Sequence, residues 1–171
     1  DTYLYALDAA NGTEKWRFKT GDDPDIHNHV GIQSSPAVVD GIAYFGSRDS
    51  FAYAVDAATG KQLWKFSTDG SWVNNSMCVF DGKAYFGTSI PGFMHAVDSK
   101  TGKVQFSLPT GTPVFASIAL ASNTLYFGNF GGKLTAIDLK TQRPAWVFET
   151  DGAKQNAASM TNADGSIKFE V

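Results

Sequence analysis

The sequence predicts an all-β protein, a β-propeller of four-stranded antiparallel blades, with about four blades' worth of chain. Three observations lead to this prediction. A motif that joins an aspartate, a glycine turn and a large aromatic residue recurs four times, at residues 5–18, 53–66, 95–108 and 135–148. Its aspartates are separated by 48, 42 and 40 residues, which is in the range of propeller units. Apolar segments lie between the copies, and 17 glycines among 171 residues provide for many tight turns.

Each unit supplies four strands in a fixed order. The first is a run such as SPAVV and the second a run such as AYFG, and the Asp-Gly pair between them is a hairpin signal. The third is a run such as FAYAVD, and an Asp-x-x-Thr-Gly turn leads to the fourth, for example KQLWKF. The turn carboxylate can accept backbone N–H groups, and the glycine tolerates a positive φ. The aromatic residue of the fourth strand is expected to dock on the next blade, because a blade cannot bury both faces alone. These structural roles fall on Asp8, Gly12, Trp16, Asp56, Gly60, Trp64, Asp98, Gly102, Phe106, Asp138 and Trp146.

The four copies resemble the PQQ-like, or quinoprotein-type, β-propeller repeat, whose blade signature is Ala-x-Asp-x-x-Thr-Gly-x-x-x-Trp. The resemblance covers nearly the whole chain and recurs in register. Two positions depart from it: Phe106 stands where the family has tryptophan, and Gln142 stands where it has glycine. The turn at Gln142 is therefore expected to differ.

The expected organisation is one propeller segment over residues 1–171, with 16 strands in all. A half blade with the third and fourth strands lies at 1–20, and a half blade with the first and second strands lies at 155–171. Whole blades are expected at 31–68, 72–110 and 113–150. The chain begins inside a strand pattern, so we expect it to be trimmed or processed. The two half blades are complementary, which fits a four-bladed ring, an eight-bladed ring of two chains, or part of a longer chain. The resemblance favours part of a ring of six to eight blades.

Propellers bind ligands at one end of the central channel, on loops that lead into the innermost strands. The repeat register predicts which residues lie at the mouth of this channel, here called the candidate mouth, where they could contact a ligand or partner. These residues are Gln33, Trp72, Asn74, Asn75, Phe115, Gln155 and Asn156. The alternative interpretation is that these are ordinary solvated loop residues.

One insertion, at residues 21–31, carries acidic and imidazole side chains together. Carboxylates and histidines could hold a divalent metal such as zinc, manganese or iron, although their spacing matches no standard signature. The candidate ligands are Asp22, Asp23, Asp25, His27 and His29. A solvated acidic loop is the default expectation for this segment.

Composition excludes some functions. The net charge is −3 with no basic stripe, which argues against nucleic-acid binding. No apolar run has the length of a transmembrane helix. Cys78 is the only cysteine, so there is no internal disulfide, and no haem-attachment or common hydrolase motif occurs.

The resulting functional hypothesis is a non-enzymatic propeller that presents a loop-lined face to a protein or polymer partner. The resemblance implies a periplasmic or extracellular location, with a protein partner, another copy of the chain or the remaining blades as its contacts. No cofactor is expected. The first alternative is a segment of a quinoprotein dehydrogenase; the resemblance implies that such an enzyme holds PQQ and calcium beside a vicinal cysteine pair. The second alternative is a self-assembling structural array.

Overall fold

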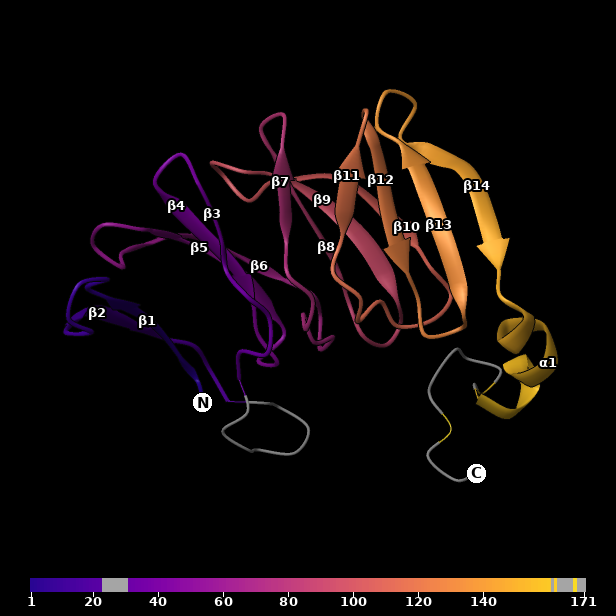
Figure 1. The fold of residues 1–171 in the computed structure, drawn as a ribbon, viewed down its shortest axis with the longest axis horizontal. Coiled ribbons are helices and arrows are strands. Elements are labelled where there is room, and N and C mark those ends of the chain that lie inside the picture. Colours follow the sequence, from indigo (N-terminus) through magenta and orange to yellow (C-terminus); the bar gives the residue numbers. More distant parts are fainter. Residues whose placement is uncertain (23–30, 161, 163–167, 169–171) are drawn as a thin grey trace.

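The computed structural model describes residues 1–22, 31–160, 162 and 168, and in these it contains 14 strands and one helix. The strands form one two-stranded and three four-stranded antiparallel sheets, which follow one another side by side in an arc (Figure 1). This arrangement confirms the predicted all-β propeller architecture.

Each sheet is a simple meander, because its strands are hydrogen-bonded in sequence order. The half blade contains β1 (Tyr3–Leu7) and β2 (Glu14–Lys19). The first blade contains β3 (Ala37–Val39), β4 (Ile42–Gly46), β5 (Phe51–Asp56) and β6 (Gln62–Ser67). The second blade contains β7 (Cys78–Phe80), β8 (Lys83–Gly87), β9 (Phe93–Asp98) and β10 (Val104–Pro109). The third blade contains β11 (Ala119–Ala121), β12 (Thr124–Gly128), β13 (Lys133–Asp138) and β14 (Arg143–Glu149).

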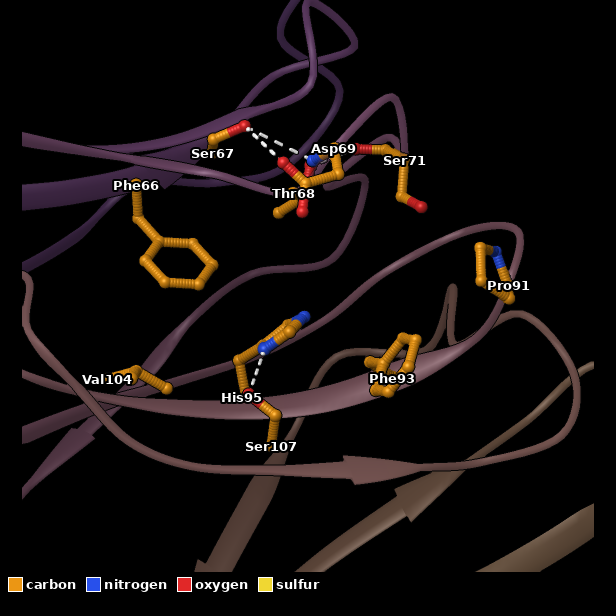
Figure 2. Close-up of a pocket in the computed structure, with 10 residues that line it drawn as sticks. All are labelled: Phe66, Ser67, Thr68, Asp69, Ser71, Pro91, Phe93, His95, Val104 and Ser107. Atoms are coloured by element: carbon orange, nitrogen blue, oxygen red, sulfur yellow. Dashed lines mark hydrogen bonds between the residues drawn. The ribbon is translucent and has the colours of Figure 1, made fainter.

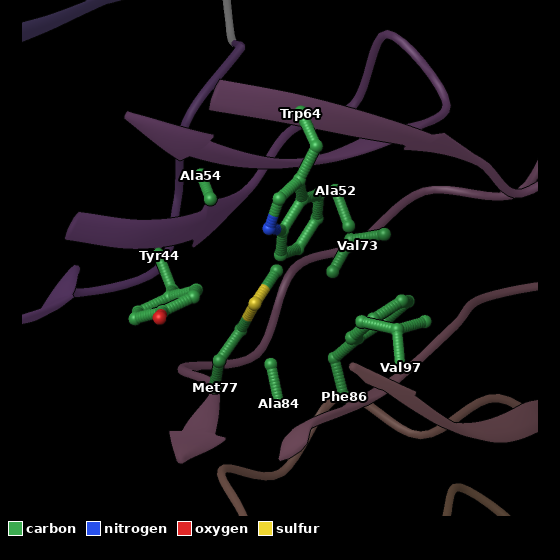
Figure 3. Close-up of a cluster of buried hydrophobic side chains, with 9 residues drawn as sticks. All are labelled: Tyr44, Ala52, Ala54, Trp64, Val73, Met77, Ala84, Phe86 and Val97. Carbon is green, nitrogen blue, oxygen red and sulfur yellow. The ribbon is translucent and has the colours of Figure 1, made fainter. Parts of the chain in front are cut away.

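The hydrophobic core lies between the blades. Between the first and second blades, Trp64 and Met77 pack against Phe86 and their neighbours (Figure 3). Similar clusters join the half blade to the first blade and the second blade to the third. The central strands β4, β5, β8 and β9 are buried along most of their length, because each of their blades has a neighbour on both faces. By contrast, every residue of β14 is exposed.

The chain after the third blade differs from the prediction. A strand was expected to begin at residue 155, but Asp151–Met160 form the helix α1. Thr150 caps this helix, since its hydroxyl accepts the N–H of Ala153 at 3.1 Å. The segment DGAKQNAASM is rich in alanine and other good helix formers. The half blade predicted here would hold only first and second strands, without the third strand of a blade to pair with. The described residues therefore hold 14 strands rather than 16, and most of 161–171 lies outside them.

Candidate functional sites: the joints between blades and the inner loops

At two joints, a tryptophan of the repeat connects one blade to the next. Trp16 Nε1 donates to the carbonyl oxygen of Ala57 at 3.1 Å, and Trp64 Nε1 donates to the carbonyl oxygen of Ser99 at 2.8 Å. Each acceptor directly follows the motif aspartate of the next blade. Each indole thus bridges two sheets with one directional bond in addition to its apolar contact.

The turn glycine is the other half of this joint. Gly60 has φ of 72°, and a Cβ there would lie 2.7 Å from the Trp16 ring; the corresponding distance from Gly102 to Trp64 is 2.8 Å. Such contacts are too close for any side chain, so the turn needs glycine both for its backbone and for the neighbouring indole.

This geometry connects the two departures from the repeat. By register, Phe106 occupies the indole position opposite the turn that contains Gln142, and Phe106 packs on the same cluster as Leu139. Gln142 keeps the left-handed backbone, with φ of 56°. A Cβ at Gln142 needs the space that an indole would fill, and phenylalanine is the smaller ring. The aromatic residue and its receiving position therefore change together.

The motif aspartates hold the turns themselves. Asp56 Oδ1 accepts the N–H groups of Ala58 and Thr59 and the Thr59 hydroxyl, at 2.8–3.0 Å. Bonds of this kind favour the ionised carboxylate, and they lower the pKa of Asp56, chiefly through Thr59. Asp98 has the same bonds and also has a lowered pKa.

The segments that lead into the first strand of each blade, here called the inner loops (31–36, 71–77 and 112–118), are fixed to the preceding blade. Val73 N–H donates to the Ser47 carbonyl at 3.1 Å, and Val114 N–H donates to the Thr88 carbonyl at 2.9 Å. The side chain of Val73 fills the space beside Gly46, and that of Val114 fills the space beside Gly87.

The side chain of Asn75 connects the second and third blades through hydrogen bonds. Its Nδ2 donates to the carbonyls of Gly87 and Val114, both at 2.8 Å, and its Oδ1 accepts the Gly87 N–H at 3.1 Å. Both amide hydrogens are used within the protein, and the side chain is fully buried. This arrangement gives Asn75 a positioning task within the candidate mouth.

The repeated serines follow the same path from blade to blade. Ser76 Oγ accepts the N–H of Ser35 at 3.1 Å, and Ser117 Oγ accepts the N–H of Ser76 at 3.4 Å. The inner loops of neighbouring blades therefore touch directly.

Besides Asn75, four of the predicted mouth residues lie on these inner loops. Gln33 is exposed, whereas Trp72, Asn74 and Phe115 are half-buried. The guanidinium of Arg48 lies 3.7 Å from the centre of the Trp72 ring, a cation–π contact. Phe115 packs edge-on against Phe130, with ring centres 6.3 Å apart. Within the described residues, Asn74 Oδ1 and Trp72 Nε1 are buried with no hydrogen-bond partner.

The remaining mouth and metal candidates are placed differently. Gln155 lies exposed in α1 rather than on an inner loop, and the backbone of Asn156 belongs to the same helix, while its side chain is outside the described part. Asp22 is exposed, and the other four metal candidates lie outside the described residues; these are Asp23, Asp25, His27 and His29. In the described ranges no cluster of three or more metal-ligating side chains occurs.

A pocket of about 460 Å³ lies between the first and second blades (Figure 2). Phe66, Phe93 and Val104 are among its apolar walls, and His95 lies between them. Nδ1 of His95 is 2.8 Å from the Ser107 hydroxyl. Burial lowers the pKa of His95 to about 4, against an opposing effect of the Asp69 carboxylate. The histidine is therefore neutral at pH 7.

Sequence patterns did not predict a polar pair at the joint between the half blade and the first blade. The Tyr53 hydroxyl donates to Asp49 Oδ2 at 2.5 Å, and the same oxygen accepts the Gly21 N–H at 2.7 Å. Burial and the adjacent carboxylate raise the pKa of Tyr53. His95 occupies the repeat position of Tyr53, and Pro91 that of Asp49. This replacement was the available signal for the different surroundings at His95.

The fold and its repeated joints define a β-propeller protein of the PQQ-like repeat class. A family profile described as "Outer membrane protein assembly factor BamB" matches residues 1–168, and the chain belongs to this family. A curated relative is the dehydrogenase subunit of a quinone alcohol dehydrogenase from Komagataeibacter europaeus. It is 31% identical over 188 residues, which cover 94% of this chain and 25% of the relative. The chain thus spans about a quarter of that protein.

Solved structures show the same fold. BamB from Moraxella catarrhalis matches with a TM-score of 0.71 and 16% identity, over 86% of this chain and 46% of that protein. The quinohemoprotein alcohol dehydrogenase ADHIIG from Pseudomonas putida HK5 matches with a TM-score of 0.74 and 20% identity, over 88% of this chain and 32% of the enzyme. In the described part of the chain, no helix has both the length and the apolar character required to cross a membrane.

Proposed function

We propose that this propeller segment is a non-enzymatic binding module whose inner-loop face contacts a protein or polymer partner. The observation that carries the proposal is that hydrogen bonds fix the inner loops to neighbouring blades. These are the backbone bonds of Val73 and Val114 and the side-chain bonds of Asn75. A rigid face loses little conformational entropy on binding. Gln33, Trp72 and Phe115 offer amide and aromatic contacts on this face.

The location we propose is the periplasm or the cell exterior. The family description names an outer-membrane assembly factor, which supports this location and a protein partner. The net charge of −3 gives the chain no electrostatic attraction to nucleic acid.

Site-specific photo-crosslinking tests the binding face. A photoreactive phenylalanine analogue at Gln33 or Phe115 should form crosslinks to a partner in a cell-envelope extract. The matched control is the same analogue at Lys61, an exposed position in the turn at the other end of the first blade. Crosslinks from all three positions alike, or from Lys61 alone, would contradict the proposal.

The second candidate function is a segment of a quinoprotein dehydrogenase, which the 31% identity to a quinone alcohol dehydrogenase subunit favours. PQQ and calcium are the cofactors that this function would require. Calcium takes six to eight oxygen ligands, mostly carboxylates and carbonyls. Gln33, Trp72, Asn74 and Phe115 supply amides and aromatic rings, with one buried amide oxygen on Asn74, and do not fit such a site by themselves.

A titration separates the two functions. PQQ with calcium is added to the purified chain, and its absorbance is followed. The binding-module proposal expects no saturable spectral change. A stoichiometric change that requires calcium would favour the dehydrogenase function instead.

A further inference from the structure

The pocket between the first and second blades has aromatic walls and one carboxylate. The rings of Phe66 and Phe93 lie on either side of His95, with their centres 5.3 and 5.6 Å from the centre of the imidazole (Figure 2). Asp69 is the only charged side chain among the described residues that line the pocket, since His95 is neutral at pH 7. These lining residues come from the first two blades and the segment that joins them, so both walls of the pocket are present.

The first blade shows what the repeat places over the ring that corresponds to Phe93. There, Nζ of Lys65 lies 4.4 Å from the centre of the Phe51 ring, a cation–π contact. In the second blade Phe93 occupies the position of Phe51, and the strand register puts Ser107 at the position of Lys65. Serine carries no charge, and the Ser107 hydroxyl is bonded to His95. The second blade therefore keeps the aromatic ring but has lost the cation that covers it in the first blade.

The hydroxyl hydrogens around the pocket are used within the protein. The Thr68 hydroxyl donates to the Ser71 carbonyl, and the Ser71 hydroxyl donates to the Ile90 carbonyl. The Ser67 hydroxyl donates to one carboxylate oxygen of Asp69 at 3.1 Å. Within the described ranges Asp69 forms no ion pair. An anionic ligand would thus meet a negative charge and find these donors already used, whereas a cation would meet a carboxylate and the faces of aromatic rings.

We propose that this pocket binds a small organic cation whose nitrogen carries methyl groups, such as a trimethylammonium ion. The cation lies against the Phe93 ring, as Lys65 lies over Phe51 in the first blade, and Asp69 supplies the opposite charge. Methyl groups on the nitrogen contact the apolar walls, whereas a primary ammonium is strongly hydrated and would have to lose that water. A pocket of about 460 Å³ is large enough for an ion of this kind. The inference is independent of what the inner-loop face binds.

Calorimetric titration of the full chain with choline, in a low-salt buffer, tests the site. We expect saturable binding of one choline per chain. The neutral carbon analogue, in which a tert-butyl group replaces the trimethylammonium group, should bind at least about tenfold more weakly, because it loses the attraction to the rings and to the carboxylate. Ethanolamine, which has the charge without the methyl groups, should also bind more weakly than choline. Absence of saturable binding at millimolar choline, or equal binding of the neutral analogue or of ethanolamine, would overturn the proposal.

Asp69→Asn and Phe93→Leu remove the two attractive groups one at a time. Each should weaken choline binding by about fivefold or more, since each deletes one electrostatic contact with the cation. Asp81→Asn is the matched control. Asp81 is exposed and has φ of 48°, close to the 51° of Asp69, but it lies in the hairpin turn between β7 and β8, outside the pocket lining. Asparagine tolerates this backbone, so the control removes the same charge without strain and should bind choline like the parent.

Circular dichroism shows whether each variant has kept its strands. Asp69 is exposed, so Asp69→Asn is expected to fold and decides the question even if Phe93→Leu does not fold. A folded Asp69→Asn protein that binds choline as tightly as the parent would overturn the proposal. Equal weakening by Asp69→Asn and Asp81→Asn would also overturn it, because the effect would then come from the net charge of the chain rather than from this pocket.

Discussion

Trp64 and Trp146 are the same residue in equivalent positions with different surroundings. Trp64 is buried and hydrogen-bonded to Ser99, whereas Trp146 is nearly half exposed and contacts Tyr126 with ring centres 5.9 Å apart. We expect Trp64→Ala to lower the free energy of unfolding by about 3–5 kcal/mol, the usual cost of removing a buried aromatic side chain. Trp146→Ala should cost about 1 kcal/mol or less, because this side chain is 46% exposed.

Urea denaturation at low protein concentration measures both values. The dependence of unfolding free energy on urea should stay the same in both variants, since neither changes the surface that unfolding exposes in the rest of the chain. Equal losses in the two variants would mean that the joint at Trp64 contributes nothing beyond its own blade.

Phe106 and Gln142 allow the coupling between aromatic residue and turn to be measured. Phe106→Trp should destabilise the protein by about 1–3 kcal/mol, because the larger ring meets the Gln142 side chain. In the Gln142→Gly background the same change should be neutral or stabilising, because the two substitutions together restore the arrangement seen for Trp64 over Gly102. The difference between backgrounds is the coupling free energy of a double-mutant cycle.

Gln142→Asn is the control for this cycle. Asparagine also adopts a positive φ but keeps a Cβ, so it should not rescue Phe106→Trp. Additive effects of Phe106→Trp and Gln142→Gly would show that the two positions do not touch.

His95 should make stability depend on pH. Its pKa is about 4 in the folded chain and about 6.5 when unfolded, so between these values the unfolded state binds more protons. Stability is therefore complete above about pH 6.5 and falls as the pH decreases toward 4. From pH 7.5 to pH 5 the loss from this group should be about 2 kcal/mol.

His95→Phe isolates the contribution of the imidazole. All other titratable groups are shared by the two proteins, including Asp69, which faces the pocket. Urea unfolding at both pH values should therefore show a smaller decrease for His95→Phe than for the parent. The same decrease in both proteins would contradict a buried, neutral histidine.

Residue types alone can predict the turns, whereas the surroundings of inner-loop residues such as Asn75 depend on contacts with residues distant in sequence. The Asp-x-x-Thr-Gly pattern encodes a local structure, and Asp56 and its neighbours form it with bonds inside five residues. The side-chain amide of Asn75 donates to the carbonyls of Gly87 and Val114, which are distant in sequence. No local pattern could therefore show that this amide is hydrogen-bonded within the protein.

At the scale of the elements, the sequence predicted the three whole blades and the first half blade. Alternation, hairpin signals and turn glycines all point to the same strands, and the observed strands lie within the predicted blade ranges. The element that sequence reasoning missed is α1. The repeat register favoured a strand there, but a strand requires partners across the sheet, whereas a helix satisfies its backbone bonds within the segment. Capping by Thr150 and three alanines then favour the helix.

For the whole molecule, stability should follow the number of neighbouring blades. In a repeat array each unit is stabilised by its own folding and by its contacts with adjacent units. Among the described residues, the second blade has a four-stranded neighbour on both faces, the half blade has one neighbour, and β14 on the outer side of the third blade is exposed (Figure 1). The ends of the arc should therefore open more easily than its middle.

Amide hydrogen exchange of the chain tests this gradient. Exchange should be slowest in β8 and β9 and faster by at least about tenfold in β1, β2 and β14, since local opening free energies fall toward poorly packed elements. The strands of the second blade serve as the internal reference, since that blade has a four-stranded neighbour on each side. Uniform exchange across all blades would contradict an arc held together by nearest-neighbour joints.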